Sequence, residues 1–263
     1  MFSQKKDTTM RIAALYDIHG NLPALEAALD AIARADVDAL VVGGDVVAGP
    51  MPTETLACLR ALPLPVHFIR GNADGEVAER MAGIPAGQAL PAHVREIIDW
   101  VAQQLSDDDG RFLAGWPLTL RLPIDGIGTV LFCHATPQSD TPVFTRLTPE
   151  PQLHDTFRDT DAALVVCGHT HMPFDRQIGG VRVVNSGSIG MPYGEPGAHW
   201  LLLGPGVQAR RADYDRERAA ARIRASNYPQ REDFAANNVL NVPSEAEALA
   251  AFTPMEIGAS RTA

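Results

Sequence analysis

Residues 39–49 have the sequence Ala-Leu-Val-Val-Gly-Gly-Asp-Val-Val-Ala-Gly, and the rest of the chain can be interpreted outward from them. The short apolar run before the two glycines is typical of a strand buried on both faces of a sheet. Asp45 ends this stretch, beside glycines that let other groups approach the backbone closely, and it is well placed to bridge two metal ions. Taken alone, an aspartate here is more often a turn residue that caps the next segment.

Strands and helices alternate on both sides of this stretch. Apolar patterns predict strands over residues 11–16 and 66–69, and helices over residues 22–35 and 52–62. This order indicates right-handed βαβ crossovers and a largely parallel sheet, in which ligands bind beyond the carboxyl ends of the strands. Three polar residues fall at such strand ends, namely Asp17, Asp45 and Asn72.

The remaining chain predicts a second, β-rich sheet. The expected elements are helices over residues 75–81 and 92–105, a hairpin of residues 118–122 and 130–132, and strands over residues 162–166, 174–178, 181–184 and 199–203. Residues 137–151 form a proline- and threonine-rich loop that is either a lid or a long connection. Residues 214–263 predict a helical tail. We expect two sheets packed face to face with helices outside, in a single domain of residues 1–263.

Composition and charge exclude several classes of function. The chain has 263 residues, of which 46% are hydrophobic, so it can bury a sizeable core. Its net charge of −10, with no lysine after Lys6, argues against a broad nucleic-acid-binding surface. A substrate phosphate would therefore be held largely by bound metal. The three cysteines show no CxxC spacing, so neither a disulfide framework nor a cysteine zinc site is expected.

The N-terminus and the hydropathy pattern predict a cytoplasmic protein without a membrane segment. The sequence contains no uninterrupted apolar run of about 20 residues, and residues 1–9 are polar rather than a secretion signal. Met10 directly precedes the first strand and is a candidate natural start, so we expect residues 1–9 to be a disordered extension.

Seven residues with metal-binding side chains lie at predicted strand ends. They are Asp17, His19, Asp45, Asn72, His134, His169 and His171. Mixed carboxylate, imidazole and amide ligands suit Mn, Fe, Co, Ni or Zn better than Ca or Mg. Two such ions about 3.5–4 Å apart can share a carboxylate and a hydroxide, which is a nucleophile at neutral pH. Any single histidine is more often structural, so the hypothesis depends on the whole set.

These residues also carry a family resemblance. In order, the motifs are Asp17-x-His19, Gly44-Asp45, Gly71-Asn72, His134 and Gly168-His169-Thr170-His171. Over residues 10–203 they resemble the five motifs of the calcineurin-like metallophosphoesterases. Asn185-Ser186-Gly187-Ser188 and the form Asp-Ile-His-Gly-Asn of the first motif are similar to the small bacterial phosphodiesterase branch, which is loosely akin to the symmetrical diadenosine tetraphosphatases. The resemblance implies an α/β fold, a four-layer α/β/β/α sandwich of two mixed β-sheets flanked by helices.

The resemblance further implies a role for each ligand and a cofactor. Asp17, His19 and His171 would hold one divalent ion, and Asn72, His134 and His169 would hold the second. Asp45 would bridge them, so that Asp45 and Asn72 act in catalysis through a metal-bound hydroxide. The implied ions are two divalent transition metals, with Mn favoured and Fe, Ni, Co or Zn as alternatives.

One position departs from the family pattern. In many members a histidine that assists the leaving group follows the Gly-Asn motif, but Ala73 stands there in this chain. Asp74 is not an easy replacement, since it is expected to be the N-cap of the next helix. General-acid help is commonly worth about 10² to 10⁴ in rate, so its loss should matter most for poor leaving groups. We therefore expect activated diesters, cyclic nucleotides or phosphoanhydrides as substrates.

Two further residues are candidate substrate contacts. Arg70 and Asn21 each lie close in sequence to a predicted ligand and could donate hydrogen bonds to a phosphoryl oxygen. The alternatives are a solvated or ion-paired arginine and a helix-capping asparagine. The preferred function is a metal-dependent phosphodiesterase or nucleotide hydrolase that acts on a small phosphate ester or nucleotide. A phosphomonoesterase or protein phosphatase is the second hypothesis, and a non-catalytic binding scaffold, as in a retromer subunit resembling this family, is the third.

Overall fold

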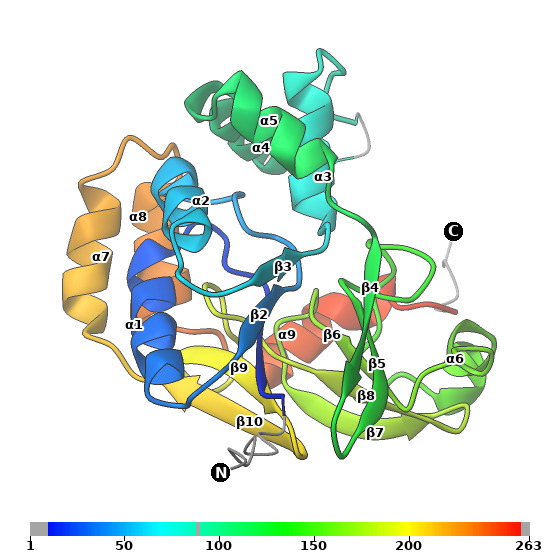
Figure 1. Cartoon of the computed structure of the whole chain (residues 1–263). Helices are drawn as coiled ribbons and strands as arrows, with labels where there is room; N and C mark the ends of the chain where they lie inside the picture. Colours follow the sequence, from blue (N-terminus) through cyan, green and yellow to red (C-terminus); the bar gives the residue numbers. More distant parts are fainter. Residues whose placement is uncertain (1–9, 88–89, 259–263) are drawn as a thin grey trace, which may run out of the picture.

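The computed structural model describes residues 10–87 and 90–258. The expected extension of residues 1–9 lies outside the described residues, as do the last five residues of the predicted tail. In the described ranges the strands form two five-stranded sheets (Figure 1). No helix in this part of the chain has the length and apolar character that crossing a membrane requires.

Both sheets are mixed. The first contains, in spatial order, β10 (Val207–Ala212), β9 (Ala198–Leu203), β1 (Ile12–Leu15), β2 (Ala39–Val42) and β3 (Val66–Phe68). The second contains β4 (Thr119–Ile124), β5 (Gly128–Cys133), β6 (Leu164–Cys167), β8 (Val181–Asn185) and β7 (Phe174–Ile178). Strands β1, β2 and β3 are parallel, whereas β9 and β10 run antiparallel to their neighbours. In the second sheet β5, β6 and β8 are parallel and the edge strands are antiparallel.

Side-chain alternation along the strands separates three apolar layers. On β1, Ile12 and Ala14 face the second sheet, while Ala13 and Leu15 face the outer helices. The layer between the sheets includes Phe132 of β5. Because successive side chains of a strand point to opposite faces, an all-apolar strand must be covered on both sides. The apolar run of residues 40–42 is accordingly buried completely, as predicted.

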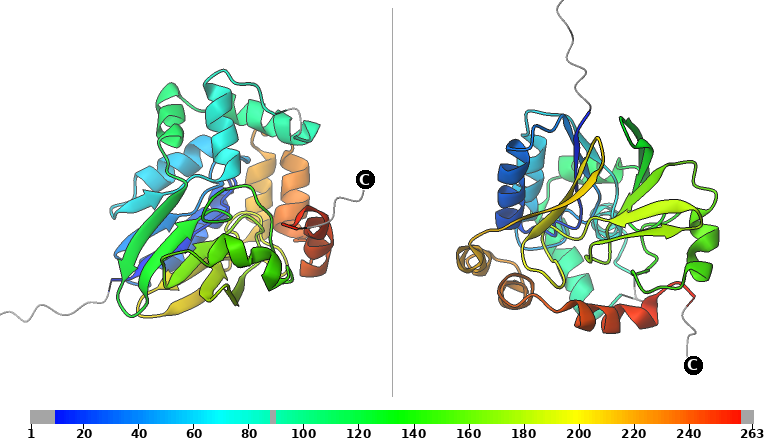
Figure 2. Two further views of the ribbon diagram at one scale, coloured as in Figure 1. Left: turned by 90° about the vertical axis from the view of Figure 1, so that its right-hand side faces the viewer. Right: turned by 90° about the horizontal axis from the view of Figure 1, so that it is seen from below.

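Helices flank the two sheets (Figure 1). They are α1 (Leu22–Ala33), α2 (Pro52–Arg60), α3 (Asn72–Met81), α4 (Ala92–Gln104), α5 (Asp107–Ala114), α6 (Glu150–Phe157), α7 (Arg216–Arg224), α8 (Arg231–Phe234), the π-helix η1 (Ala235–Leu240), α9 (Glu245–Phe252) and the 3-10 helix η2 (Thr253–Met255). Helix α1 lies against the first sheet and α6 against β7 of the second. The four-layer α/β/β/α arrangement is therefore confirmed. In Figure 2 the chain from α7 to α9 runs along one side of the molecule from the first sheet toward the second.

The expectation that residues 199–203 continue the second sheet is wrong. Strand β9 pairs antiparallel with β1, and β10, which the sequence does not predict, pairs with β9 at the edge of the first sheet. The connection before β9 crosses between the sheets, because Ile189 N donates to Tyr16 O and Gly190 N donates to Asp17 O. All six residues of β9 are buried, as a strand between two others requires.

Residues 137–149 form a packed connection that leads into α6. Phe144 lies in the apolar layer beneath α6, and Thr145 and Thr148 are buried. Ile257 N donates a hydrogen bond to Val143 O, which ties the C-terminal chain to this segment. Of the two alternatives, this packing favours a fixed connection over a lid.

Candidate metal centre

Loops at the carboxyl ends of five strands converge on one place in the molecule. Asp17 follows β1, Asp45 follows β2, and Asn72 opens α3 directly after β3. His134 follows β5, and the loop after β6 carries the last two histidines. The parallel strands of both sheets end on the same side, and the structure therefore brings all seven predicted residues together.

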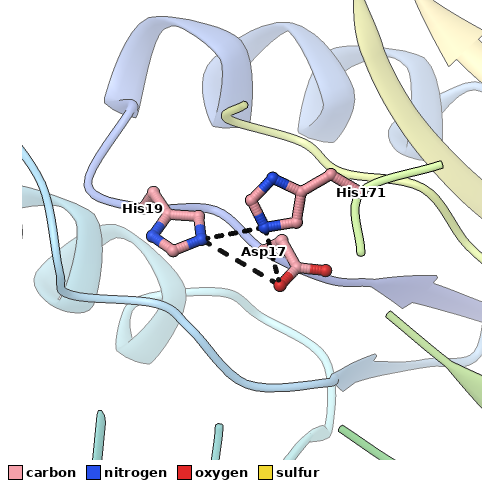
Figure 3. A group of neighbouring side chains, drawn as sticks. All are labelled: Asp17, His19 and His171. Carbon is pink, nitrogen blue, oxygen red and sulfur yellow. Dashed lines mark hydrogen bonds and ion pairs between the residues drawn. The ribbon is translucent and has the colours of Figure 1, made fainter. Parts of the chain in front are cut away.

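The first group consists of Asp17, His19 and His171 (Figure 3). Their candidate ligand atoms all lie within 4.8 Å of one another, and all three residues are buried. His171 Nε2 is 3.3 Å from Asp17 Oδ1 and 3.2 Å from His19 Nε2. Two imidazole nitrogens and one carboxylate oxygen thus face a common point, which is the donor set that a borderline divalent ion prefers.

The second group consists of Asp45, His134 and His169. His134 Nε2 is 3.5 Å from Asp45 Oδ2 and 3.2 Å from His169 Nδ1. The two groups share a boundary, because Asp45 Oδ2 also lies 3.6 Å from His19 Nε2 of the first group. Asp45 therefore contacts both groups, as its predicted bridging role requires.

Each of the four histidines is oriented by a backbone carbonyl. In His19, His134 and His171 the Nδ1 atom lies 2.8–3.1 Å from a carbonyl oxygen, and in His169 the Nε2 atom lies 3.2 Å from Thr141 O. A ring N–H donates there, so in the neutral imidazole the other nitrogen presents its lone pair to the centre. Such outer hydrogen bonds commonly fix the tautomer of metal-binding histidines.

The same geometry leaves the centre short of positive charge. Facing lone pairs meet at 3.2 Å in both histidine pairs, which is repulsive unless a proton or a metal ion lies between them. In addition, Asp17 Oδ1 and Asn72 Oδ1 are buried without a hydrogen-bond partner in the described part of the chain. Buried polar atoms almost always have a partner. A pair of cations would satisfy all of these atoms, so the residues fit the metal ions that the motifs imply.

Without metal, the charges and the burial of the two groups shift the pKa values of the four histidines. Burial tends to lower the pKa of His134, but Asp45, its hydrogen bond and Asp17 raise it to about 10. Burial and the charge of His134 lower the pKa of His169 to about 4. In the other group, burial tends to lower the pKa of His171, but the charge of Asp17 and its hydrogen bond raise it overall. Burial lowers the pKa of His19. In each group the pKa of one ring is therefore raised and the pKa of the other is lowered.

We expect Mn²⁺ binding at pH 7 to release at least about one proton. His134 carries a proton at this pH because its pKa is raised to about 10, and a cation must displace that proton to reach the ring nitrogen. The apparent affinity should therefore rise about tenfold per pH unit for each proton released. Calorimetric titration in buffers of different ionisation enthalpy measures the proton count. A pH-independent affinity between pH 6 and 8 would contradict this assignment.

Unusual backbone torsions distinguish these loops. Positive φ values of 48–68° occur at five predicted ligands, namely Asp17, His19, Asp45, His169 and His171. Among the other described non-glycine residues only Asp36 shares this conformation. Left-handed torsions at non-glycine residues are uncommon and are concentrated at functional sites, although Asp and His tolerate them better than most. The backbone N–H groups of Asp17, His19 and Gly20 donate to the carbonyl groups of residues 44–46, which holds the loops after β1 and β2 together.

The expectation that Asp74 is the N-cap of the next helix is wrong, because Gly71 has that position and Asp74 is the third residue of the first turn. Helix α3 begins at Asn72, so Asp74 lies in its first turn, where it is completely buried. Its carboxylate accepts hydrogen bonds from the backbone N–H groups of Val46, Val47 and Gly71. Burial and the charge of Asp45 raise the pKa of Asp74 to about 7. Asp74 thus holds the loop that carries Asp45 against the start of α3.

The two candidate substrate contacts are engaged within the protein. Asn21 is fully buried, and it caps α1 by accepting from Ala24 N while its Nδ2 donates to Gly190 O. Contact with a substrate would require these bonds to break, so the structure supports the capping alternative. Arg70 donates from Nε to Asp140 Oδ2 at 2.9 Å and is partly exposed. This is the ion-paired alternative, and a phosphate contact by Arg70 stays a prediction.

Glu76 is a site residue that the sequence reasoning missed. It lines the same cavity as Asn72 and Ala73. Burial, Asp45 and other nearby acidic groups raise its pKa to about 7. Its position four residues after Asn72 puts both side chains on one face of α3, and this spacing is the signal that could have identified it.

The chain combines two mixed sheets with two adjacent groups of candidate metal ligands at their strand ends. This combination is expected of an α/β metalloprotein. A model of the calcineurin-like phosphoesterase superfamily domain matches residues 10–204. The chain therefore belongs to the calcineurin-like phosphoesterase superfamily. Membership indicates a metal-dependent hydrolase of phosphate esters, and it confirms the resemblance of the motifs.

The chain is also similar to individual proteins in sequence or in fold. An uncharacterized protein of Methanocaldococcus jannaschii is 28% identical over 182 residues, which are 68% of this chain and 69% of that protein. A hypothetical protein from Pyrococcus horikoshii superimposes with a TM-score of 0.75 at 21% identity, covering 89% of this chain and 100% of that one. A metallophosphoesterase from Sphaerobacter thermophilus gives a TM-score of 0.69 at 25% identity, with coverages of 89% and 99%.

Proposed function

We propose that this protein is a dinuclear metal-dependent phosphoesterase that hydrolyses phosphodiesters or nucleotide phosphoanhydrides. The observation that carries the proposal is the pair of facing histidine nitrogens in each group, with Asp45 in contact with both groups. When bound, two divalent ions would lower the pKa of water and polarise the phosphoryl oxygens. The seven residues named above would hold these ions.

The side chains of the protein would hold the ions in position and balance part of their charge. Asp45 would neutralise part of the charge of two adjacent cations, and its Oδ1 is fixed by a 2.9 Å hydrogen bond from Ala73 N. Carbonyl contacts keep the four imidazoles in one tautomer, so no reorientation is needed when substrate binds. Ala73 lines the cavity and brings no proton donor, which favours esters whose leaving groups depart without protonation.

The second candidate is a phosphomonoesterase, which Glu76 favours. Its carboxyl group lies one helical turn after Ala73 and lines the same cavity. With a pKa raised to about 7, first by burial and then by Asp45, it is partly protonated near neutral pH and could donate to a leaving group.

Two esters of one phenol separate these candidates. Metal-stripped protein would be reloaded with Mn²⁺, Fe²⁺, Co²⁺, Ni²⁺, Zn²⁺ or Mg²⁺ and assayed with bis(p-nitrophenyl) phosphate and p-nitrophenyl phosphate. We expect faster turnover of the diester, and loss of activity when a chelator removes the metal. Faster monoester turnover would favour the second candidate. A protein that binds none of these metals would favour a scaffold.

Restoring a histidine in Ala73→His should raise monoester turnover relative to diester turnover. Residue 73 faces the cavity beside Asn72, so a new imidazole can reach the leaving group. General-acid catalysis is worth about 10² to 10⁴ in rate, and we expect about tenfold from an unoptimised ring. The ratio of kcat/KM values for the two esters measures the effect. Ala73→Gln, which adds a polar side chain without a titratable proton, is the control. Equal ratios in the two variants would contradict the acid argument.

A further inference from the structure

A cavity of about 700 Å³ opens directly from the candidate metal centre. His19, Asp45, Asn72 and His169 line one end of it. A volume of this order is typical of sites that enclose a small molecule, and it exceeds what a phosphoryl group alone would fill. The remainder of the cavity is therefore available to the group that the phosphate carries.

Most of the remaining wall is apolar and comes from two distant parts of the chain. One side is formed by α4 and Leu90, and the other by the C-terminal helices. The apolar wall residues include Leu90, Val94, Ile97, Phe234, Phe252 and Met255. Met255 lines the cavity and is also 56% exposed, so this part of the wall is in contact with solvent.

Aromatic contacts connect this wall to the metal-binding residues. The ring of Tyr193 stacks on His171 with a centroid distance of 5.6 Å, and it meets Phe252 edge-on at 5.9 Å. Tyr193 also lines the cavity. The apolar surface is therefore continuous from a predicted ligand to the C-terminal helices, and an ester held at the metal centre would lie against it.

The charges in the cavity oppose a second anionic group. Among its described lining residues there is no lysine or arginine, while Glu76 and Asp233 are acidic. The amide side chains there, Gln230, Asn237 and Asn238, can form hydrogen bonds but cannot neutralise a phosphate. A chain of further phosphates would lose its hydration and approach acidic side chains, of which Glu76 is only partly ionised, whereas a neutral apolar arm would gain contacts.

We propose that this cavity binds the non-reacting arm of a phosphodiester, and that this arm is neutral and mainly aliphatic or aromatic. This inference rests on the proposed function, because it needs a phosphoryl group at the metal centre. It narrows the substrate class, since it disfavours the nucleotide phosphoanhydrides that the motifs alone leave open.

A series of p-nitrophenyl phosphodiesters tests the proposal with the leaving group held constant. The second arm would be methyl, butyl, phenyl or 3-carboxypropyl, and kcat/KM would be measured with the Mn²⁺-loaded protein. We expect kcat/KM to rise about two- to fourfold for each buried methylene. The carboxypropyl ester should be at least about tenfold slower than the butyl ester of similar length. A flat series, or faster turnover of the carboxylate, would overturn the inference.

Substitutions in the cavity wall test whether the cavity causes the preference for the butyl ester over the carboxypropyl ester. Val94 lies in the wall of the cavity. Val94→Arg adds a positive charge there, so it should abolish the preference for the butyl ester and raise kcat/KM of the carboxypropyl ester about tenfold or more. Gln103→Arg makes the same charge change at an exposed position of α4 outside this cavity and should leave the preference unchanged. Met255→Ala, at an exposed position, should reduce the butyl preference about threefold without unfolding the protein. Unchanged preference in both wall variants would overturn the inference.

A binding measurement separates failure of the inference from failure of the proposed function. Non-hydrolysable methyl, butyl and carboxypropyl phosphonates would be titrated into the Mn²⁺-loaded protein by calorimetry. Tighter binding of the butyl compound supports the inference even if no ester is hydrolysed. Hydrolysis of the methyl ester without any dependence on the arm supports the proposed function and rejects the inference.

Discussion

Asp45→Asn is expected to reduce hydrolytic activity about a thousandfold or more while the fold stays intact. Its Oδ2 lies 3.6 Å from His19 Nε2 and 3.5 Å from His134 Nε2, so this carboxylate serves both groups of candidate ligands. Loss of an outer partner of a metal ligand typically costs about 10- to 100-fold in activity, and loss of a shared charge should exceed that. Asparagine retains an oxygen that can accept from Ala73 N, so the loop can keep its shape.

The measurement is kcat/KM with Mn²⁺, together with metal content and circular dichroism of the same samples. Asp36→Asn is a matched control, because Asp36 also has a positive φ of 49° but lies exposed after α1. The control should keep wild-type activity. Wild-type activity in a folded Asp45→Asn protein would contradict the role assigned to Asp45.

Gly44→Ala is expected to destabilise the protein by about 2–6 kcal/mol and to disrupt the candidate metal centre. Gly44 has a φ of +93°, and a Cβ built there would lie 2.4 Å from Gly71 N and 2.8 Å from His134 Nδ1. A left-handed torsion outside the usual range costs about 1–3 kcal/mol, and forced overpacking adds about 1–3 kcal/mol. The backbone of Gly71 cannot move away freely, because Asn72 follows it at the site.

Denaturant unfolding and Mn²⁺ titration together measure both parts of this prediction. Gly206→Ala is the control, since a Cβ there meets nothing within 4 Å and its φ is outside the left-handed region. It should change the free energy of unfolding by no more than about 1 kcal/mol. A Gly44→Ala protein with wild-type stability and metal affinity would show that the segments of residues 43–45 and 70–72 are not tightly packed.

The layered fold could be predicted because its interior strands are short and apolar. The run of residues 40–42 has no polar residue, so it must be covered on both faces, and the alternating helices supply one cover. Strand β10 was not predictable in the same way, because residues 207–211 are mostly polar or exposed and only its end, Ala212, is buried. Helix α6 has only eight residues, and a proline in its first turn is compatible with a helix start but does not require one, so local sequence did not predict it. The sheet to which β9 belongs depends on hydrogen bonds with β1, over more than 180 residues of intervening chain.

The candidate ligands could be predicted because they follow strand ends in a fixed order. The hydrogen bonds that Asp74 accepts from Val46 and Val47, and the bond from Asn21 to Gly190, could not, because these partners come from loops distant in sequence. The apolar wall beside the centre is also a tertiary feature. Val94 and Phe252 line one cavity, yet each lies in a helix whose own pattern indicates only an ordinary buried face.

The left-handed torsions at the predicted ligands bear on how the protein would select its ion. Folding alone sets the direction of these side chains, so the empty and occupied frames should be nearly the same shape. Exchange of one ion for another would then require little rearrangement, and geometry would discriminate weakly among ions of similar radius. The metal bound to the native protein would consequently reflect which ions are available as much as the protein itself, and it could change when that supply changes.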